Sequence, residues 1–101
     1  MRDAAEYISK NTEDYTAVSS TKSFNFISEQ IYNYHPVLAG TVCDAYGHAV
    51  LIVGWDKSSG TQSITYFDPG DGSYRTCTYA EFCNGSFSGT SYVETCYNTA
   101  S

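Results

Sequence analysis

The chain has 101 residues, which is enough for one domain or for part of one. Hydrophobic residues make up 42% of it and aromatic residues 16%, so a real core can form. Its formal net charge of -6 argues against nucleic acid or an anionic membrane as a partner. No apolar run approaches the roughly 18–20 residues that span a bilayer, so no membrane span is expected.

Two helices are expected in the first third of the chain. Residues 3–10 predict a short helix with Asp3 as its N-cap, and the polar, turn-prone residues 11–21 predict a loop. The stronger signal covers residues 24–33, where Phe24, Ile27 and Ile31 recur on one side. Ser23 is the expected N-cap, and the helix must end before Pro36.

From Pro36 onward the pattern predicts strands. We expect five, over residues 37–43, 48–55, 62–68, 74–79 and 91–97, separated by short turns rich in glycine and polar residues. Short turns make neighbouring strands antiparallel. Residues 48–53 are apolar on both faces, so this strand should be central, with the 24–33 helix covering one face. The predicted fold is α+β, a curved antiparallel sheet of about five strands covered by one main helix.

His48 begins the predicted central strand, and Asp68 ends the next one. A pairing register that sets His48 directly opposite Asp68 puts both side chains on the same face, and a shift of one residue would separate them. A three-residue loop with a bulge at Gly60 gives the first register, which we predict. The alternatives without a catalytic role are that His48 is a strand histidine bonded to the backbone and that Asp68 belongs to an ordinary Asp-Pro-Gly turn.

The chain carries four cysteines, and either reduced thiols or one or two disulfides fit the pattern. There is no Cys-x-x-Cys motif, and His35 and His48 lack the spacing that tetrahedral zinc sites usually show. No metal and no cofactor are therefore expected. The four cysteines are Cys43, Cys77, Cys83 and Cys96.

Three segments occur in an order that is characteristic of one enzyme class: residues 31–39 (IYNYHPVLA), 47–56 (GHAVLIVGWD) and 67–72 (FDPGDG). Together they resemble the C-terminal half of papain-like cysteine peptidases. The bacterial branch is most similar, including the peptidase domains that trim leader peptides in bacteriocin transporters and related secreted peptidases. The likeness covers about residues 23–83 and includes a short helical segment at residues 79–82.

The resemblance implies that His48 is the general base and that Asp68 orients its ring, with Asp where plant papain has Asn. Gly47 and Gly54 would be structural. It further implies a peptide or protein substrate and a bacterial protein that is secreted or at the cell surface. Residues 1–101 would then form a single domain, or the C-terminal subdomain of a papain-like cysteine peptidase.

The chain departs from this family where the nucleophile is concerned. These peptidases carry the catalytic Cys on a helix, preceded by a Gln that donates to the oxyanion hole, and residues 1–47 contain no such arrangement. Gln30 has no Cys at suitable spacing after it, and Cys43 ends a strand, without the helix N-terminus that lowers a thiol pKa. We therefore expect this chain alone to be inactive and its partner to be a missing N-terminal half that carries the Cys. The apolar face left uncovered could form a homodimer.

Two other functions fit the same sequence. One is a non-catalytic peptide- or protein-binding module on a peptidase-derived scaffold, with contacts from Tyr66, Tyr74, Tyr79, Tyr92 and Tyr97. The other is a transglutaminase-like or acyltransferase fold, which shares the order Cys, His, Asp and ranks below the first two. The nature of the residues encoded before Arg2 would discriminate between an enzyme and a module.

Overall fold

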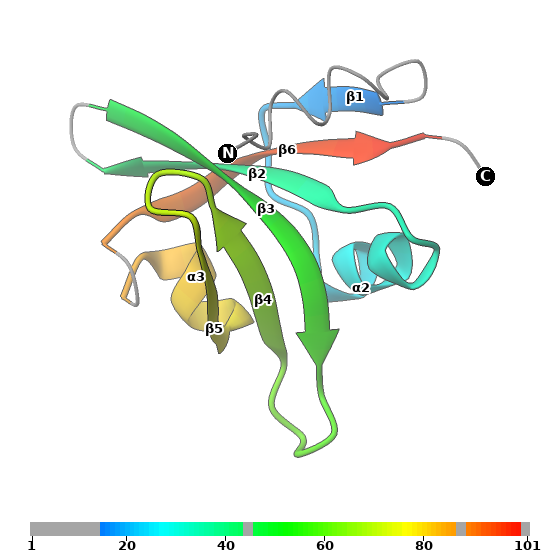
Figure 1. Ribbon diagram of the computed structural model, residues 1–101. Coiled ribbons are helices and arrows are strands. Elements are labelled where there is room, and N and C mark those ends of the chain that lie inside the picture. Colours follow the sequence, from blue (N-terminus) through cyan, green and yellow to red (C-terminus); the bar gives the residue numbers. More distant parts are fainter. Residues whose placement is uncertain (1–14, 44–45, 87–88, 100–101) are drawn as a thin grey trace.

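The computed structural model describes residues 15–43, 46–86 and 89–99. They form an antiparallel sheet of six strands in the order β1-β6-β2-β3-β4-β5, together with two short helices (Figure 1). The strands are β1 (Tyr15–Val18), β2 (Val37–Cys43), β3 (Tyr46–Asp56), β4 (Ser63–Asp68), β5 (Ser73–Thr78) and β6 (Ser91–Asn98). The helices are α2 (Phe24–Tyr32) and α3 (Tyr79–Asn84).

Helix α2 begins and ends where its sequence predicts. The Ser23 hydroxyl accepts a hydrogen bond from the Phe26 backbone N–H at 3.1 Å, which satisfies one of the free donors of the first turn. Phe24 and Ile27 form its buried side. The chain leaves the helix through Asn33 and through Tyr34, whose φ of 64° is left-handed, before Pro36.

Helix α3 is held by a capping box. The Thr78 hydroxyl accepts from the Glu81 backbone N–H at 3.1 Å, while the Glu81 carboxylate accepts from the Thr78 backbone N–H at 3.0 Å. The side chain of Phe82 is buried. Tyr79 therefore begins this helix and does not end strand β5, as the sequence pattern had predicted.

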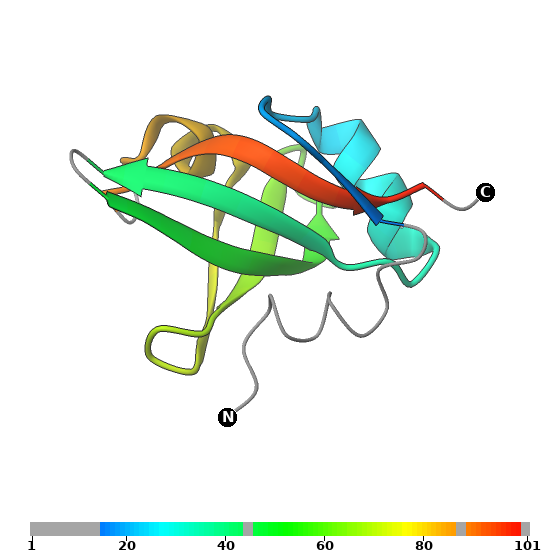
Figure 2. The ribbon, with the colours of Figure 1, turned by 90° about the horizontal axis from the view of Figure 1, so that it is seen from above.

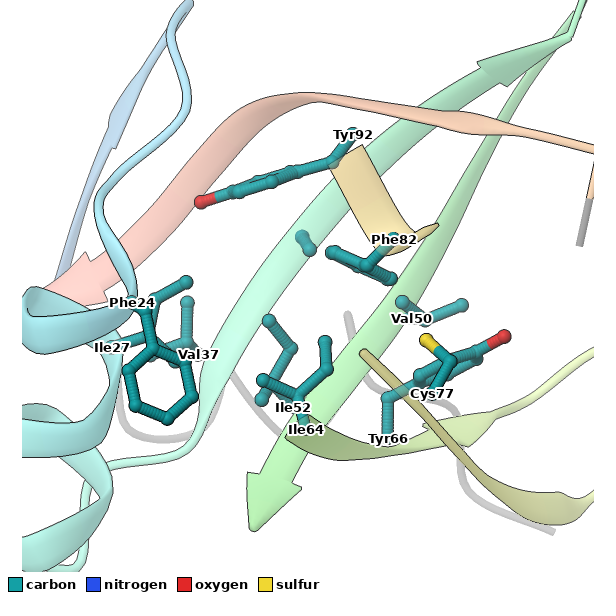
Figure 3. Close-up of a cluster of buried hydrophobic side chains, with 11 residues drawn as sticks. Phe24, Ile27, Val37, Val50, Ile52, Ile64, Tyr66, Cys77, Phe82 and Tyr92 are labelled. Atoms are coloured by element: carbon teal, nitrogen blue, oxygen red, sulfur yellow. The ribbon is translucent and has the colours of Figure 1, made fainter. Parts of the chain in front are cut away.

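One hydrophobic core lies between the sheet and both helices. Side chains from α2, α3 and strands β2 to β6 form a single cluster (Figure 3). Both helices therefore pack on the same face of the curved sheet (Figure 2). Full burial of a valine or isoleucine side chain contributes roughly 1.5–3 kcal/mol to the stability of the fold. The buried members are Phe24, Ile27, Val37, Ala39, Val50, Ile52, Ile64, Tyr66, Cys77, Phe82 and Tyr92.

The predicted sheet of five strands under one main helix is wrong in two respects. Residues 15–18, predicted as loop, form strand β1, which pairs with β6 from Tyr15↔Asn98 to Val18↔Thr95. Helix α3 contributes Phe82 to the core, so the cover is two short helices. The five strands that were predicted are all present, with their ends within two residues of the predicted ones. The helix predicted over residues 3–10 lies outside the described residues.

Two irregularities interrupt the ladders of the sheet. The pairing of β2 with β6 shifts between Gly40 and Thr41, and the pairing of β3 with β4 shifts between Ile52 and Gly54. Bulges of this kind bend a strand and increase its twist, in keeping with the curvature seen in Figures 1 and 2. Within the part of the chain that the structure describes, no helix is long and apolar enough to cross a membrane.

Candidate active site

The imidazole of His48 and the carboxylate of Asp68 are in direct contact. His48 Nε2 lies 2.7 Å from Asp68 Oδ1, a short hydrogen bond of the kind that a charged acceptor makes. The side chains are 29% and 18% exposed, so the pair is shielded but reachable from solvent. His48 belongs to β3, and Asp68 is the last residue of β4.

The register that brings them together is not the predicted one. Near the hairpin loop, Asp56 pairs with Ser63, and beyond the bulge Leu51 pairs with Phe67. Continued along the strands, the second register leaves His48 two positions past the residue opposite Asp68, so the contact is diagonal. The bulge lies at Val53, and no bulge at Gly60 sets the register.

The bulge at Val53 decides which face Asp68 occupies. Had the loop-end register continued unbroken, Asp68 would lie opposite Leu51 and point away from His48. The one extra residue in β3 reverses this alternation, so His48 and Asp68 share the face that carries the core. The sequence pattern could not locate this bulge, because Ile52 and Val53 are residues that favour a regular strand. Only Gly54, which follows them, departs from that pattern.

The contact fixes the tautomer of the neutral imidazole. An ionised carboxylate only accepts hydrogen bonds, so Nε2 of His48 must carry the proton that Asp68 Oδ1 receives. The lone pair of the neutral ring then lies on Nδ1. Among the described residues, none hydrogen-bonds to Nδ1. The arrangement therefore offers a base at Nδ1, with its ring held from the opposite nitrogen.

Asp68 is held by more than the histidine. Its Oδ1 also accepts from the Gly70 backbone N–H at 2.9 Å, and its Oδ2 faces Arg75 Nε at 4.0 Å. The end of the Arg75 guanidinium bonds to Asp71, and this hydrogen bond, with a smaller attraction from Asp68, raises the pKa of Arg75. Arg75 Nε is buried and has no hydrogen-bond partner of its own.

Sequence reasoning missed Gly70 and Arg75 as parts of this site. Arg75 lies opposite Tyr66 in the β4–β5 ladder and on the face of Cys77, two residues further along the strand. Strand alternation in a hairpin joined by the four residues 69–72 could have placed it beside Asp68. Gly70 could have been noticed only through its position two residues after the carboxylate.

A cavity of about 210 Å³ opens beside the pair. Three of the residues that line it, Val50, Tyr66 and Phe82, belong to the core. The others are polar or charged: Thr41, His48, Asp68, Arg75 and Thr90. No cysteine is among the described residues that line it.

The three cysteines whose side chains the structure describes are free thiols: Cys77, Cys83 and Cys96. Burial raises the pKa of Cys77 to about 11 and also raises the pKa of Cys96, so both favour the unreactive protonated form. Cys43 ends strand β2 and pairs with Tyr46 of β3, two positions along the ladder from the pair Thr41↔His48. Its side chain lies outside what the structure describes.

Gln30 has a structural part in the fold. Its side-chain amide donates to the Asn98 backbone carbonyl at 3.0 Å and accepts from the Asn98 backbone N–H at 3.0 Å. Both polar groups of Gln30 therefore bond to the last residue of β6, at the opposite end of that strand from Tyr92, which pairs with Thr41, the neighbour of His48.

Most of the five tyrosines expected as contacts of a binding module are shielded from solvent. Tyr66 and Tyr92 lie in the core, and Tyr79 and Tyr97 are partly buried. Of the five candidates only Tyr74 is well exposed, at 67%. The described residues also contain no group of three or more His, Cys, Asp or Glu side chains that could hold a metal ion.

Comparison with models of known protein families gives a match. The family described as papain-like cysteine protease AvrRpt2 matches residues 6–86, which is most of the chain and includes both His48 and Asp68. No curated protein is similar enough to match. The match supports the papain-like resemblance in general and gives no support for a particular likeness to bacteriocin-transporter peptidase domains.

Proposed function

Because the chain belongs to the papain-like cysteine protease AvrRpt2 family, we propose that His48 and Asp68 are the base and the ring-orienting carboxylate of a cysteine peptidase. The observation that carries the proposal is the 2.7 Å contact between His48 Nε2 and Asp68 Oδ1. It leaves Nδ1 as the proton-accepting atom of the neutral ring, which is what activation of a thiol requires.

In the proposed reaction, His48 Nδ1 takes the proton of a cysteine thiol, and the thiolate attacks the carbonyl carbon of a peptide bond. The imidazolium formed is stabilised by the Asp68 carboxylate on its other side. His48 then gives the proton to the departing amine, and water hydrolyses the acyl-enzyme with the same ring as base. Every proton transfer in this scheme uses one nitrogen atom.

We propose that the thiol comes from outside these 101 residues and that the chain alone does not hydrolyse peptides. Cys77, Cys83 and Cys96 do not line the cavity beside His48, and two of them have a raised pKa. Cys43 belongs to a strand, without the helix N-terminus that lowers the pKa of reactive thiols.

The source of the thiol can be tested on the isolated chain. Each cysteine is alkylated with iodoacetamide at pH 6 and pH 8 and quantified by mass spectrometry, in the wild type and in His48→Ala. A thiol activated by an imidazole stays reactive at the lower pH. We expect no cysteine to react at pH 6 in a manner that depends on His48. A cysteine that does so would be the nucleophile and would contradict its placement outside the chain.

The peptidase activity is tested in the chain joined to the segment proposed to supply the thiol (the longer protein), using a quenched fluorescent peptide library. We expect His48→Ala to lower kcat/KM by roughly 10²–10⁴-fold, the usual contribution of general acid–base catalysis. His35→Ala is the matched control, because His35 lines a different cavity with Ile31, Pro36 and Val53. Full activity in His48→Ala, with or without an effect of His35→Ala, would overturn the proposed function.

A further inference from the structure

We propose that Gly70 is a positioning residue of this site. Its backbone N–H holds the oxygen of Asp68 that receives the imidazole proton, and its lack of a side chain leaves the space in which the His48 ring stands. The inference rests on the proposed function and assigns to the Asp-Pro-Gly segment a role beyond that of a turn.

The first support is that two donors meet on one oxygen. Asp68 Oδ1 accepts from His48 Nε2 at 2.7 Å and from Gly70 N at 2.9 Å, which uses both of its lone pairs. The torsion that turns an Asp carboxylate about its own axis has broad, weakly defined minima. The carboxylate therefore has little orientation preference of its own, and the fixed amide of Gly70 supplies one.

The second support is steric. A Cβ atom at Gly70 would lie 3.1 Å from Asp68 Oδ1 and 3.2 Å from His48 Cε1. Both distances are shorter than ordinary van der Waals contact, so the ring or the carboxylate would have to move by a few tenths of an ångström. The two nearest atoms belong to the two residues of the pair, and the third nearest is His48 Nε2 at 3.8 Å.

The third support is that the backbone itself does not require glycine here. The φ of Gly70 lies outside the left-handed region, whereas Gly72 in the same turn has a φ of 72°. Gly72 also closes the turn, since its N–H donates to the Asp68 carbonyl at 2.8 Å. Gly72 therefore accounts for the turn, and the close approach of the His48–Asp68 pair accounts for Gly70.

This difference provides a matched pair of variants. Gly70→Ala keeps an allowed backbone and intrudes on the pair, whereas Gly60→Ala strains a backbone with φ of 88° and meets no atom within 4 Å. Histidine labelled with ¹⁵N in the 101-residue chain reports the tautomer through its two ring nitrogen shifts. It also reports the bonded Nε2 proton as a slowly exchanging downfield resonance.

We expect Gly70→Ala to lengthen the bond between His48 Nε2 and Asp68 Oδ1, so that the Nε2 proton resonance moves upfield and exchanges faster with solvent, with a melting temperature near that of the wild type. Gly60→Ala should lower the melting temperature and leave both ring signals unchanged. Wild-type ring signals in Gly70→Ala would overturn the proposal. A merely structural role for Gly70 would move the melting temperature and not the Nε2 proton resonance.

A second measurement tests the amide contact without changing Gly70. Asp68→Ala removes the acceptor, so the Gly70 amide proton should shift upfield and exchange faster with solvent, as for a donor that loses a charged partner. An unchanged Gly70 amide would overturn the amide part even if Gly70→Ala failed to fold.

The role in catalysis is read in the longer protein. There we expect Gly70→Ala to lower kcat by up to about 10²-fold with little change in KM, because misplacement of a catalytic group acts on the chemical step. The two proposals fail in different ways. A shifted Nε2 proton resonance in Gly70→Ala together with full hydrolysis by His48→Ala would remove the proposed function and leave the positioning contact established.

Discussion

The side-chain amide of Gln30 makes two hydrogen bonds to the backbone of Asn98, one to its carbonyl and one to its N–H. The side-chain amide thus bonds to the end of β6 in the way that the backbone of a neighbouring strand would. Helix and strand are 68 residues apart in sequence, so the contact joins distant parts of the chain.

Gln30→Ala should therefore destabilise the fold by about 1–3 kcal/mol, since each net hydrogen bond contributes about 0.5–1.5 kcal/mol. Urea unfolding followed by tryptophan fluorescence measures this. Gln62→Ala is the control, because the side chain of Gln62 is exposed in the β3–β4 loop. Equal unfolding free energies for the two variants would contradict the structural part assigned to Gln30.

Asp68→Asn should be much milder than Asp68→Ala. The asparagine has one oxygen and one NH₂ group, and the position of Oδ1 has two donors at 2.7 and 2.9 Å, whereas Arg75 Nε is 4.0 Å from the other position. Two close donors outweigh one distant donor, so the amide oxygen should face His48 and keep the Nε2–H tautomer. We expect kcat/KM in the longer protein within about tenfold of wild type for Asp68→Asn and a loss of roughly 10²-fold or more for Asp68→Ala.

The prediction on Asp68→Asn depends on Gly70, which supplies one of the two donors. Alanine keeps this N–H, but its Cβ would lie 3.1 Å from Oδ1, so Asp68→Asn combined with Gly70→Ala should lower the rate by more than the two single effects together. Additive, small effects in the double variant would indicate that the amide orientation is set elsewhere.

Acid should weaken the fold partly through Asp71. The pKa of Asp71 is lowered from 3.8 to about 2, first by the hydrogen bond from the Ser73 side chain and then by that from Arg75. A carboxyl group with a depressed pKa stabilises the fold above its unfolded value, and this contribution is lost as the pH falls from about 4 through 2. Asp71→Asn should flatten the pH dependence of the melting temperature in this range. An Asp71 carboxyl carbon that titrates near 3.8 in the folded chain would contradict the expectation.

Alkali should act through Cys77. Burial is the main cause that raises the pKa of Cys77 from 9.0 to about 11, with a smaller contribution from Glu81. Because the folded chain favours the protonated thiol, the contribution of Cys77 to the stability of the fold is fully present below pH 9. It is lost as the pH rises through about 11. At pH 8.5 we expect iodoacetamide to modify Cys77 roughly 100-fold more slowly in the folded chain than in 6 M urea, because the thiolate is the reacting form. Equal rates in the two states would show that Cys77 is accessible and ionises normally.

The parts of the fold that sequence predicted are those with local signals. Helix α2 has a serine cap, an apolar stripe and a terminating Pro36, and strands β3, β4 and β5 are separated by turns that contain glycine. Strand β1 has no such signal. Its four residues lie among polar ones, and their strand conformation depends on pairing with β6 at the far end of the chain. A strand that is fixed by a distant partner cannot be recognised from its own neighbourhood.

The expected contact between His48 and Asp68 is present, although the register predicted for it is wrong. Two registers, the predicted one and the observed one, both place the two residues on one face, because they differ by two positions. The sequence could indicate the shared face and could not indicate where the strand gains its extra residue. The role of the pair in catalysis stays a prediction.

The bulge at Val53 also uncouples the loop from the site. The ladder near residues 57–62 and the ladder near His48 follow different registers, so a relative could gain or lose a residue in one without disturbing the other. The number of residues between histidine and aspartate is then free to drift during evolution, provided that the two still emerge on the same side of the sheet. Searches for related sequences that demand a fixed interval between these residues would overlook such relatives, whereas a search that lets the interval vary and asks for glycine two places after the aspartate would find them.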